Sequence, residues 1–189
     1  MDEQTLKTEE ALKSIKSSDF KILEQKINHG FVDLYVDKKE IFKALETLKK
    51  NPSLRCNNLH CISGVDYVDH MEVVYHLYSY NLGHKIALKA RVTKEDNELA
   101  SAYPLWKTAD WQEREIFEMY GIKFNGHPNL RNLLLTDDFP GYPLRKDFPL
   151  ANNEEWLLED TQTAKDYGLP EDLSELLKTN VKNNGEKKS

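Results

Sequence analysis

Alternation of apolar and polar residues between positions 59 and 92 constrains the fold more than any other feature of this sequence. Mostly apolar residues recur at every second position in Leu59–Tyr67, Met71–Leu77 and Ile86–Val92. Successive side chains of a strand point to opposite faces, so this period is typical of strands with one buried face. The turns are expected at Asp69-His70 and Asn81–Gly83, and the second fits a hairpin. The pattern predicts three strands of an antiparallel sheet.

The residues before these strands carry a different period. Between residues 5 and 28 the apolar side chains have helical spacing, interrupted at Ser17–Asp19 by residues that favour helix N-caps. Two short helices are therefore expected there. A short strand is expected at Phe31–Val36.

Two further helices are predicted on either side of the three strands. The first follows Asp37, whose spacing to Glu40 resembles a capping box, and it ends at Asn51-Pro52. The second is Ala109–Tyr120, with Gly121 in the C′ position. Helices before and after the strands predict an α+β fold, in which helices pack on one face of a mostly antiparallel sheet. The other face of the sheet is then open to solvent or to a partner.

Regular periodicity stops after Phe124. Prolines at positions 128, 140, 143 and 149 are incompatible with a long helix or a central strand, so an extended arm with short turns is expected. Pro170 and the acidic residues after it open a short amphipathic helix. The expected division is an α+β core domain at 1–124, a docking arm at 125–180 that is mobile in the isolated chain, and a disordered tail at 181–189.

Charge and hydropathy exclude several classes of protein. The 189 residues have a net charge of −6, with Lys and Arg spread among carboxylates, so a nucleic-acid-binding surface is not expected. No run approaches the roughly 18 apolar residues of a membrane span. The first ten residues lack the basic start and apolar run of a signal peptide. A cytoplasmic chain is expected.

Cysteine and histidine usage leaves one alternative open. The two cysteines, Cys56 and Cys61, are too few for a disulfide framework and are expected to be reduced thiols. They also cannot supply the four ligands that an iron–sulfur cluster ordinarily needs. Histidines at positions 60, 70 and 76 lie near Cys61, so a free-standing metal-binding or hydrolytic protein remains the alternative of another class.

Charged residues of the predicted helix at 109–120 are the first candidates for function. Glu113, Arg114 and Glu115 point in three directions around the helix, about 100° apart. A carboxylate pair for acid–base chemistry is one possibility. Arg114 with Glu118 is expected to form an ordinary surface pair, and a buried ion pair between subunits is the alternative.

The arm carries a second set of candidates. His127, before Pro128, has no nearby Cys, Ser or second His, so a structural, hydrogen-bonding role is expected. Arg131, Arg145 and Lys146 alternate with prolines and apolar residues, and no glycine-rich phosphate loop accompanies them. We interpret them as anchors on an arm that lies across another protein, because a proline-fixed arm loses less entropy on docking.

The segment Asp110–Leu150 carries a family resemblance. The elements ERE-x-F-x-M-Y-G-I, G-H-P-x-L-R and G-x-P-L-R-K-D-F-P stand in order at short spacings. They closely resemble the signature region of the 30-kDa-type subunit, also called the C subunit, of proton-pumping NADH:quinone oxidoreductase, respiratory complex I. A looser likeness extends back to about residue 30. Glu118 stands where the family usually has Asp, and related subunits of membrane-bound [NiFe] hydrogenases and F420H2-type dehydrogenases tolerate variation there.

The resemblance implies an accessory subunit of the peripheral arm, without a cofactor of its own. The assembly would use NADH, FMN, iron–sulfur clusters and quinone, in electron transport coupled to proton translocation. The expected partners are the large quinone-pocket subunit of 49-kDa type and neighbouring iron–sulfur subunits. The expected location is the cytoplasmic face of the cell membrane, without a membrane span.

The residues expected to dock on partners follow from the motifs. No catalytic, cofactor-binding or metal-binding residue is expected in this chain. The docking candidates are Glu113, Arg114, His127, Pro128, Arg131, Pro143, Arg145, Lys146 and Asp147. The homologous subunit of a membrane-bound [NiFe] hydrogenase or of an F420H2-type dehydrogenase is the alternative within the same class.

Overall fold

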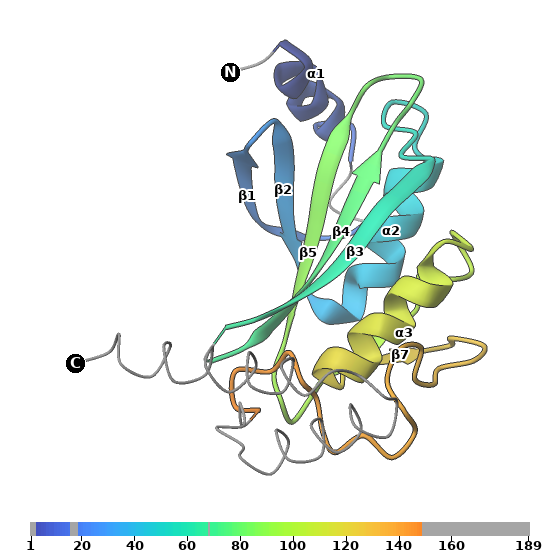
Figure 1. Ribbon diagram of the computed structural model, residues 1–189. Helices are drawn as coiled ribbons and strands as arrows, with labels where there is room; N and C mark the ends of the chain where they lie inside the picture. The colour runs from blue at the N-terminus through green and yellow to red at the C-terminus, as the bar shows by residue number, and fades with distance from the viewer. Residues whose placement is uncertain (1–2, 16–18, 68, 149–189) are drawn as a thin grey trace, which may run out of the picture. The chain divides into compact units, whose positions relative to one another are not determined.

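The computed structural model describes residues 3–15, 19–67 and 69–148 (Figure 1). The helices are α1 (Glu3–Leu12), α2 (Ile41–Lys50), α3 (Ala109–Tyr120) and the 3-10 turn η1 (Lys38–Glu40). The strands are β1 (Ile22–Asn28), β2 (Phe31–Val36), β3 (Asn58–Asp66), β4 (Met71–Tyr78), β5 (Lys85–Val92), β6 (Glu98–Ala100) and β7 (Lys123–Asn125). The helix expected from Pro170 and the tail from Val181 lie outside the described residues.

The larger sheet confirms the α+β prediction. Its five strands have the order β1-β2-β5-β4-β3. The three strands predicted from alternation are β3, β4 and β5, and they pair antiparallel, with Tyr75 opposite Ile62 on one side and Leu88 on the other. β2 pairs with β5 in parallel, with Leu34 opposite Leu88. The sheet is therefore mixed but mostly antiparallel.

The prediction of two helices between residues 5 and 28 is wrong for its second half. Among the described residues of this segment only α1 is helical, and residues 22–28 are strand β1, which pairs antiparallel with β2. His29 and Gly30 make the turn with φ values of 48° and 80°, a backbone that suits a two-residue hairpin. Most β1 side chains are exposed or half-buried, so the strand carries no two-residue apolar alternation that reveals it in the sequence.

The start of α2 differs in detail from the expected capping box. The Asp37 carboxylate accepts the backbone N–H of Lys39 (2.8 Å), which caps η1. The side chain of Glu40 does not reach back to Asp37. It accepts the backbone N–H of Lys21 instead (3.0 Å), because the chain entering β1 passes beside the turn. The end of α2 at Lys50 agrees with the predicted stop at Asn51-Pro52.

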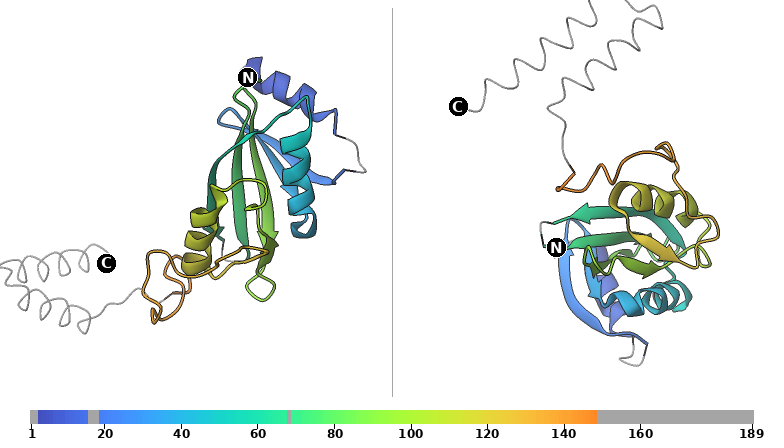
Figure 2. Two further views of the ribbon diagram at one scale, coloured as in Figure 1. Left: turned by 90° about the vertical axis from the view of Figure 1, so that its right-hand side faces the viewer. Right: turned by 90° about the horizontal axis from the view of Figure 1, so that it is seen from below.

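The core lies between the sheet and the helices. α2 and α3 lie on the same side of the sheet (Figures 1 and 2). Leu45 and Leu48 of α2 and Ile116 of α3 belong to one hydrophobic cluster with Tyr75 and Leu77 of β4. At about 25 cal/mol per Å2 of buried apolar surface, such side chains are the main source of stability. They also hold α3 in place against β3.

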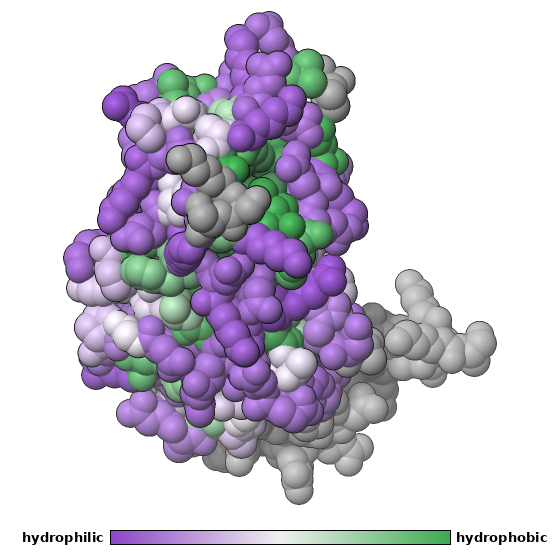
Figure 3. Space-filling view, turned by 180° about the vertical axis from the view of Figure 1, so that it is seen from behind, coloured by the Kyte–Doolittle hydropathy of each residue, from purple (hydrophilic) through white to green (hydrophobic). Residues whose placement is uncertain are grey.

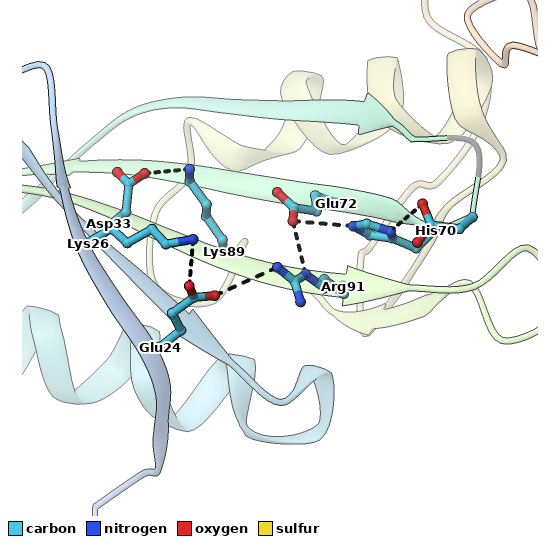
Figure 4. A network of polar contacts seen from close by, with 8 residues as sticks. Glu24, Lys26, Asp33, His70, Glu72, Lys89 and Arg91 are labelled. Carbon is cyan, nitrogen blue, oxygen red and sulfur yellow. Dashed lines mark hydrogen bonds and ion pairs between the residues drawn. The ribbon is translucent and has the colours of Figure 1, made fainter.

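The opposite face of the sheet carries a ladder of paired charges (Figure 4). The Lys89 ammonium lies 2.6 Å from the Asp33 carboxylate, and Arg91 Nε donates to Glu72 over 3.1 Å. The ring of Tyr35 lies among these cations, with the Arg91 guanidinium 4.8 Å from its centroid. Cations over aromatic faces add to the ion pairs. Opposite charges on adjacent strands therefore stabilise the face of the sheet that lies opposite α2 and α3.

The face of the molecule drawn in the space-filling view is largely hydrophilic (Figure 3). Seen from behind, hydrophobic residues show in smaller groups between hydrophilic ones (Figure 3). Within the described ranges, no helix combines the length and hydrophobicity of a membrane span.

Candidate interaction site

The candidate site consists of α3 and residues 126–148, which we call the strap. α3 is anchored on β3, where Gln112 Oε1 accepts the backbone N–H of Ile62 (2.6 Å). Gly64 lies beneath the ring of Tyr120, and a Cβ at this glycine would stand 2.7 Å from the ring. Since real Cβ atoms do not approach so closely, Gly64 allows the end of α3 to lie flat on the strand. The first residues of the site are thus positioned by the sheet.

Glu113 supports the site from within. Its side chain is fully buried, and its carboxylate accepts Ser101 Oγ–H and the Ala102 N–H, both at 2.6 Å. Burial raises the pKa of Glu113 to about 7, and the two hydrogen bonds oppose that shift. This carboxyl group fastens the loop before α3 to the helix. It faces its own chain rather than the surface.

The expected surface pair between Arg114 and Glu118 is wrong. Arg114 is 9% exposed and donates to two strap carbonyls, from Nε to Arg131 O (3.1 Å) and from Nη2 to Asn132 O (2.7 Å). Glu118 is 2% exposed and also bonds to the strap. Its carboxylate accepts the backbone N–H groups of Leu133, Leu134 and Leu135, at 2.8, 2.9 and 3.1 Å to Oε2.

The two side chains bind different groups of the strap backbone. A guanidinium holds carbonyl oxygens, and a carboxylate holds successive N–H groups one helical turn further on. Hydrogen bonds to charged groups are worth more than neutral ones, about 1.5–3 kcal/mol each. The pair therefore fixes the backbone of residues 131–135 along α3. Spacing alone gave no sign of this, because the partners are peptide groups.

His127 makes hydrogen bonds within its own chain. Its side chain is fully buried, and its Nδ1 accepts the backbone N–H of Asn129 (3.1 Å). With Nδ1 as the acceptor, the donor is Nε2–H, and Nε2 lies 3.1 Å from the carbonyl oxygen of Asp110 and 3.3 Å from its Oδ1. This bond ties the start of the strap to the first turn of α3. Pro128 beside it is exposed.

The end of α3 is closed by the strap. Arg145 Nε donates to the carbonyl of Tyr120 (2.6 Å), and its guanidinium lies over the ring of Tyr142, 4.3 Å from the centroid. Gly121 has a φ of 73°, as predicted for the C′ position. A Cβ there would stand 2.6 Å from the Tyr142 ring and 2.7 Å from Arg145 Nη2. Glycine is thus required both by its backbone angle and by the close approach of the strap.

The remaining docking candidates lie at the end of the strap. The Lys146 N–H donates to Asp66 Oδ2 (2.7 Å), and Asp147 pairs with Lys94 (2.6 Å). Pro143 is half-buried. The charged ends of Arg131 and Lys146 have no hydrogen-bond or ion-pair partner among the described residues, and both residues are exposed.

The strap packs with the core rather than apart from it. The compact unit of the chain extends to Phe148. No pattern of residues indicated these intramolecular contacts, which hold residues 126–148 in the single chain. The expected division at residue 124 stays a prediction.

The alternative metal site does not assemble. Within the described part of the chain, no three His, Cys, Asp or Glu side chains are grouped to hold a metal ion. Cys61 Sγ contacts Ser63 Oγ (3.3 Å), and His70 lies between Asp69 and Glu72. Burial raises the pKa of the Cys56 thiol to about 12, so that thiol is inert.

The site exposes several large side chains of α3 and of the strap on its surface. Arg114 and Glu118 of α3 are engaged with the backbone of the strap, while several strap side chains are exposed. Leu134 is 67% exposed and Leu144 is 53% exposed, and Trp111 on α3 is also 67% exposed. Exposed large apolar residues beside unpaired cations are features of protein interfaces.

Solved structures share the fold. A trypsin-resistant fragment (1-134) of Nqo5 aligns with a TM-score of 0.55 at 24% identity, over 66% of this chain and 99% of the fragment. A chain in the structure of the membrane-bound sulfane sulfur reductase, an archaeal respiratory membrane complex, aligns with a TM-score of 0.63 at 23% identity, over 85% of this chain and 91% of the other.

Curated relatives are more similar in sequence. The NADH-quinone oxidoreductase C subunit of Citrifermentans bemidjiense is 44% identical over 64% of this chain and 76% of the relative. Those of Caulobacter sp. (strain K31) and Saccharopolyspora erythraea are 42% and 35% identical, each over 69% of this chain, and it spans 62% and 54% of their lengths.

A family model agrees with these relatives. The model described as "Respiratory-chain NADH dehydrogenase, 30 Kd subunit" matches residues 34–154, which include most of the sheet, α3 and the strap. The likeness thus extends well beyond the signature motifs. The chain belongs to the family of the 30-kDa subunit of respiratory-chain NADH dehydrogenase.

Proposed function

We propose that this chain is an accessory subunit of the peripheral arm of an energy-converting NADH:quinone oxidoreductase, where it braces the quinone-reducing module. It carries no cofactor, and the catalytic chemistry belongs to the other subunits. The observation that carries the proposal is the strap. Arg114 and Glu118 hold its backbone, and the side chains of Arg131 and Lys146 are exposed and unpaired among the described residues, so that another protein can bind them.

Pre-organisation explains how such a strap contributes to assembly. Ordering a flexible loop on binding costs about 0.5–1.5 kcal/mol for each side chain immobilised, besides the backbone. The hydrogen bonds from α3 already order the strap backbone in the single chain, so less entropy is lost when a partner binds. A partner then meets a fixed surface, on which Pro128 and Leu134 are exposed beside Arg131. In this proposal Arg145, Asp147 and Glu113 act indirectly, by fixing the strap.

The proposed partners follow from the family. The strap faces the large quinone-pocket subunit, the 49-kDa type, and neighbouring iron–sulfur subunits complete the surroundings. The assembly takes electrons from NADH through FMN and iron–sulfur clusters to quinone, and couples this to proton translocation. We place the subunit on the cytoplasmic face of the membrane, bound through its partners.

Affinity purification of the tagged full chain from detergent-solubilised membranes tests the proposal. The wild-type chain should recover the large quinone-pocket subunit together with flavin-containing, NADH-oxidising subunits. Arg131→Glu should recover at least about tenfold less, for a loss near 1.4 kcal/mol. Arg55→Glu is the matched control, because Arg55 is also exposed but lies between α2 and β3.

The composition of the purified material decides between assemblies. A [NiFe] hydrogenase large subunit in place of the NADH-oxidising subunits would assign the chain to the hydrogenase branch. Recovery of no respiratory subunit by the wild-type chain would contradict the proposal as a whole. An equal loss of recovered subunits in Arg131→Glu and Arg55→Glu would show that Arg131 of the strap is not part of the interface.

A further inference from the structure

A second feature lies on the face of the sheet opposite α2 and α3, away from the strap. It is a hollow of about 240 Å3 formed by the ends of β2, β3, β4 and β5. Tyr78 pairs with Asn58 on β3 and with Lys85 on β5, so these side chains form one row across the sheet. His76, two residues before Tyr78, lies on the same face. We call this feature the aromatic hollow. Its lining includes the side chains of Phe31, His60, His76, Tyr78, Tyr80 and Lys85.

Aromatic rings form its walls and hold one another in place. Phe31 meets His76 edge to face at 5.4 Å between centroids, and Tyr78 meets Tyr80 in the same way at 5.1 Å. Asn58 Nδ2 donates to the hydroxyl of Tyr80 (3.0 Å), which fixes a ring that is 67% exposed. Edge-to-face pairs are favourable in themselves, so the walls are formed before anything binds.

Charge singles the hollow out from the rest of this face. In the ladder of Figure 4, Lys26 is paired with Glu24, Lys89 with Asp33, and Arg91 with Glu72. At the rim of the hollow, Lys85 is exposed and has no hydrogen-bond or ion-pair partner among the described residues, and His60 is exposed there with His76 as its electrostatic neighbour. No carboxylate of the described residues lines the hollow. Its cationic rim is therefore uncompensated.

The wall also contains an unsatisfied polar group. His76 Nδ1 is buried and has no hydrogen-bond partner within the described part of the chain. A buried polar atom without a partner is uncommon and calls for an explanation. Burial also lowers the pKa of His76, which disfavours a positive charge on this ring.

We propose that the aromatic hollow binds a planar aromatic carboxylate. The ring of the ligand packs between Phe31, Tyr78 and Tyr80, and its carboxylate meets Lys85 and His60. The space suits a single ring with its substituents, and a mostly apolar lining with a few placed polar groups is typical of small-molecule sites. The proposal does not depend on the function proposed above, because the hollow and the strap are separate.

Titration of the full chain with three probes, followed by NMR, tests the site. Benzoate has the ring and the charge, benzyl alcohol has the ring alone, and acetate has the charge alone. The resonances to follow are the ring C–H signals of His60 and His76 and the amide of Lys85. Benzoate should saturate these shifts with a dissociation constant in the roughly millimolar range of so small a ligand. Benzyl alcohol should bind about fivefold more weakly, the effect of one exposed ion pair, and acetate should not saturate.

Two variants complete the test. Lys85→Gln should reduce the preference for benzoate over benzyl alcohol to less than about twofold, whereas Lys123→Gln, an exposed lysine of β7, should retain it. Both lysines are exposed, so the fold should survive, and dispersed amide spectra would show that it does. The proposal is overturned if benzoate shifts none of the three groups, if acetate matches it, or if Lys85→Gln keeps the full preference.

Discussion

Glu118 meets the backbone N–H of Leu134 with both of its carboxylate oxygens, at 3.1 and 2.9 Å. One oxygen also takes the N–H groups of the two neighbouring leucines. A single buried side chain of α3 thereby fixes three successive peptide groups of the strap. These hydrogen bonds form within one chain, so they fix the backbone of this part of the strap without a partner protein.

Replacing Glu118 by Gln should loosen the strap. The amide offers one oxygen to three N–H donors, and its own NH2 group competes for the same space. A buried N–H left without an acceptor costs about 1–3 kcal/mol, so we expect a loss of that size in the free energy of unfolding by urea. Hydrogen exchange of Leu133–Leu135 should accelerate, while β4 amides remain protected. Unchanged protection of these leucines would mean that other contacts hold the segment.

Arg114→Lys should weaken the same segment from the other side. Arg114 reaches two carbonyls through nitrogens of one rigid plane, whereas an ammonium group has no such fork. We expect a loss of roughly 1–2 kcal/mol in stability. Arg131→Lys is the control, because that guanidinium is free among the described residues and should cost almost nothing. Equal effects in urea denaturation would show that the charge of Arg114 matters more than its geometry.

Glu113 should make stability depend on pH. Its pKa is raised from 4.5 to about 7 in the folded chain, so the folded state holds a proton that the unfolded state has released. The stabilisation is complete below about pH 4.5 and is lost as the pH rises through 7, by at most about 3 kcal/mol. Glu113→Gln keeps an acceptor for Ala102 and a donor for Ser101, and it should remove this dependence. The measurement is the wild-type minus variant difference in urea stability between pH 5 and pH 8, and a constant difference would contradict the prediction.

Gly121→Ala should be more harmful than Gly30→Ala, although both glycines have positive φ values of 73° and 80°. A Cβ at Gly30 meets nothing within 4 Å, so only the backbone strain of about 1 kcal/mol is expected. At Gly121 the same backbone strain is expected, and in addition the new Cβ would collide with the side chains of Tyr142 and Arg145, which must move. A total loss of about 2–4 kcal/mol is expected there. Thermal unfolding of both variants would decide, and equal shifts in Tm would show that the strap does not press on the end of α3.

The sequence reveals those parts of this fold whose burial is periodic. β3, β4 and β5 alternate in apolar and polar residues, and α2 presents an apolar face, so they were predictable. The bounds of α3 were also predictable, but the charged residues among those it buries, Glu113, Arg114 and Glu118, were not expected to be buried within the chain. β1 was not, because its side chains are mostly exposed and its pairing depends on the turn at His29-Gly30. The parallel pairing of β2 with β5 joins segments about fifty residues apart and has no local signal. The partners of Arg114 and Glu118 are peptide groups, which no pattern of side chains reveals.

Arg145 links the stability of the strap to assembly. The sequence suggested an anchor on another protein, and within the chain its Nε donates to the Tyr120 carbonyl. Removing the side chain leaves that carbonyl at the end of α3 without its donor and takes a cation from the Tyr142 ring. The effect on a partner is then indirect, through the shape of residues 142–148.

Arg145→Ala should therefore lower the yield of assembled complex more than the activity of each complex that forms. If the subunit braces the module without touching the reacting quinone, turnover per assembled enzyme should stay within about two- to threefold of the wild type. Native gels give the amount of complex, and quinone reductase activity normalised to that amount gives the turnover. Arg145→Lys keeps the positive charge over Tyr142, so its yield of assembled complex should lie between those of the wild type and Arg145→Ala. Normal assembly with nearly complete loss of activity per complex would instead assign the strap a direct part in the reaction. A residue that only supports assembly should not abolish the turnover of complexes that have assembled normally.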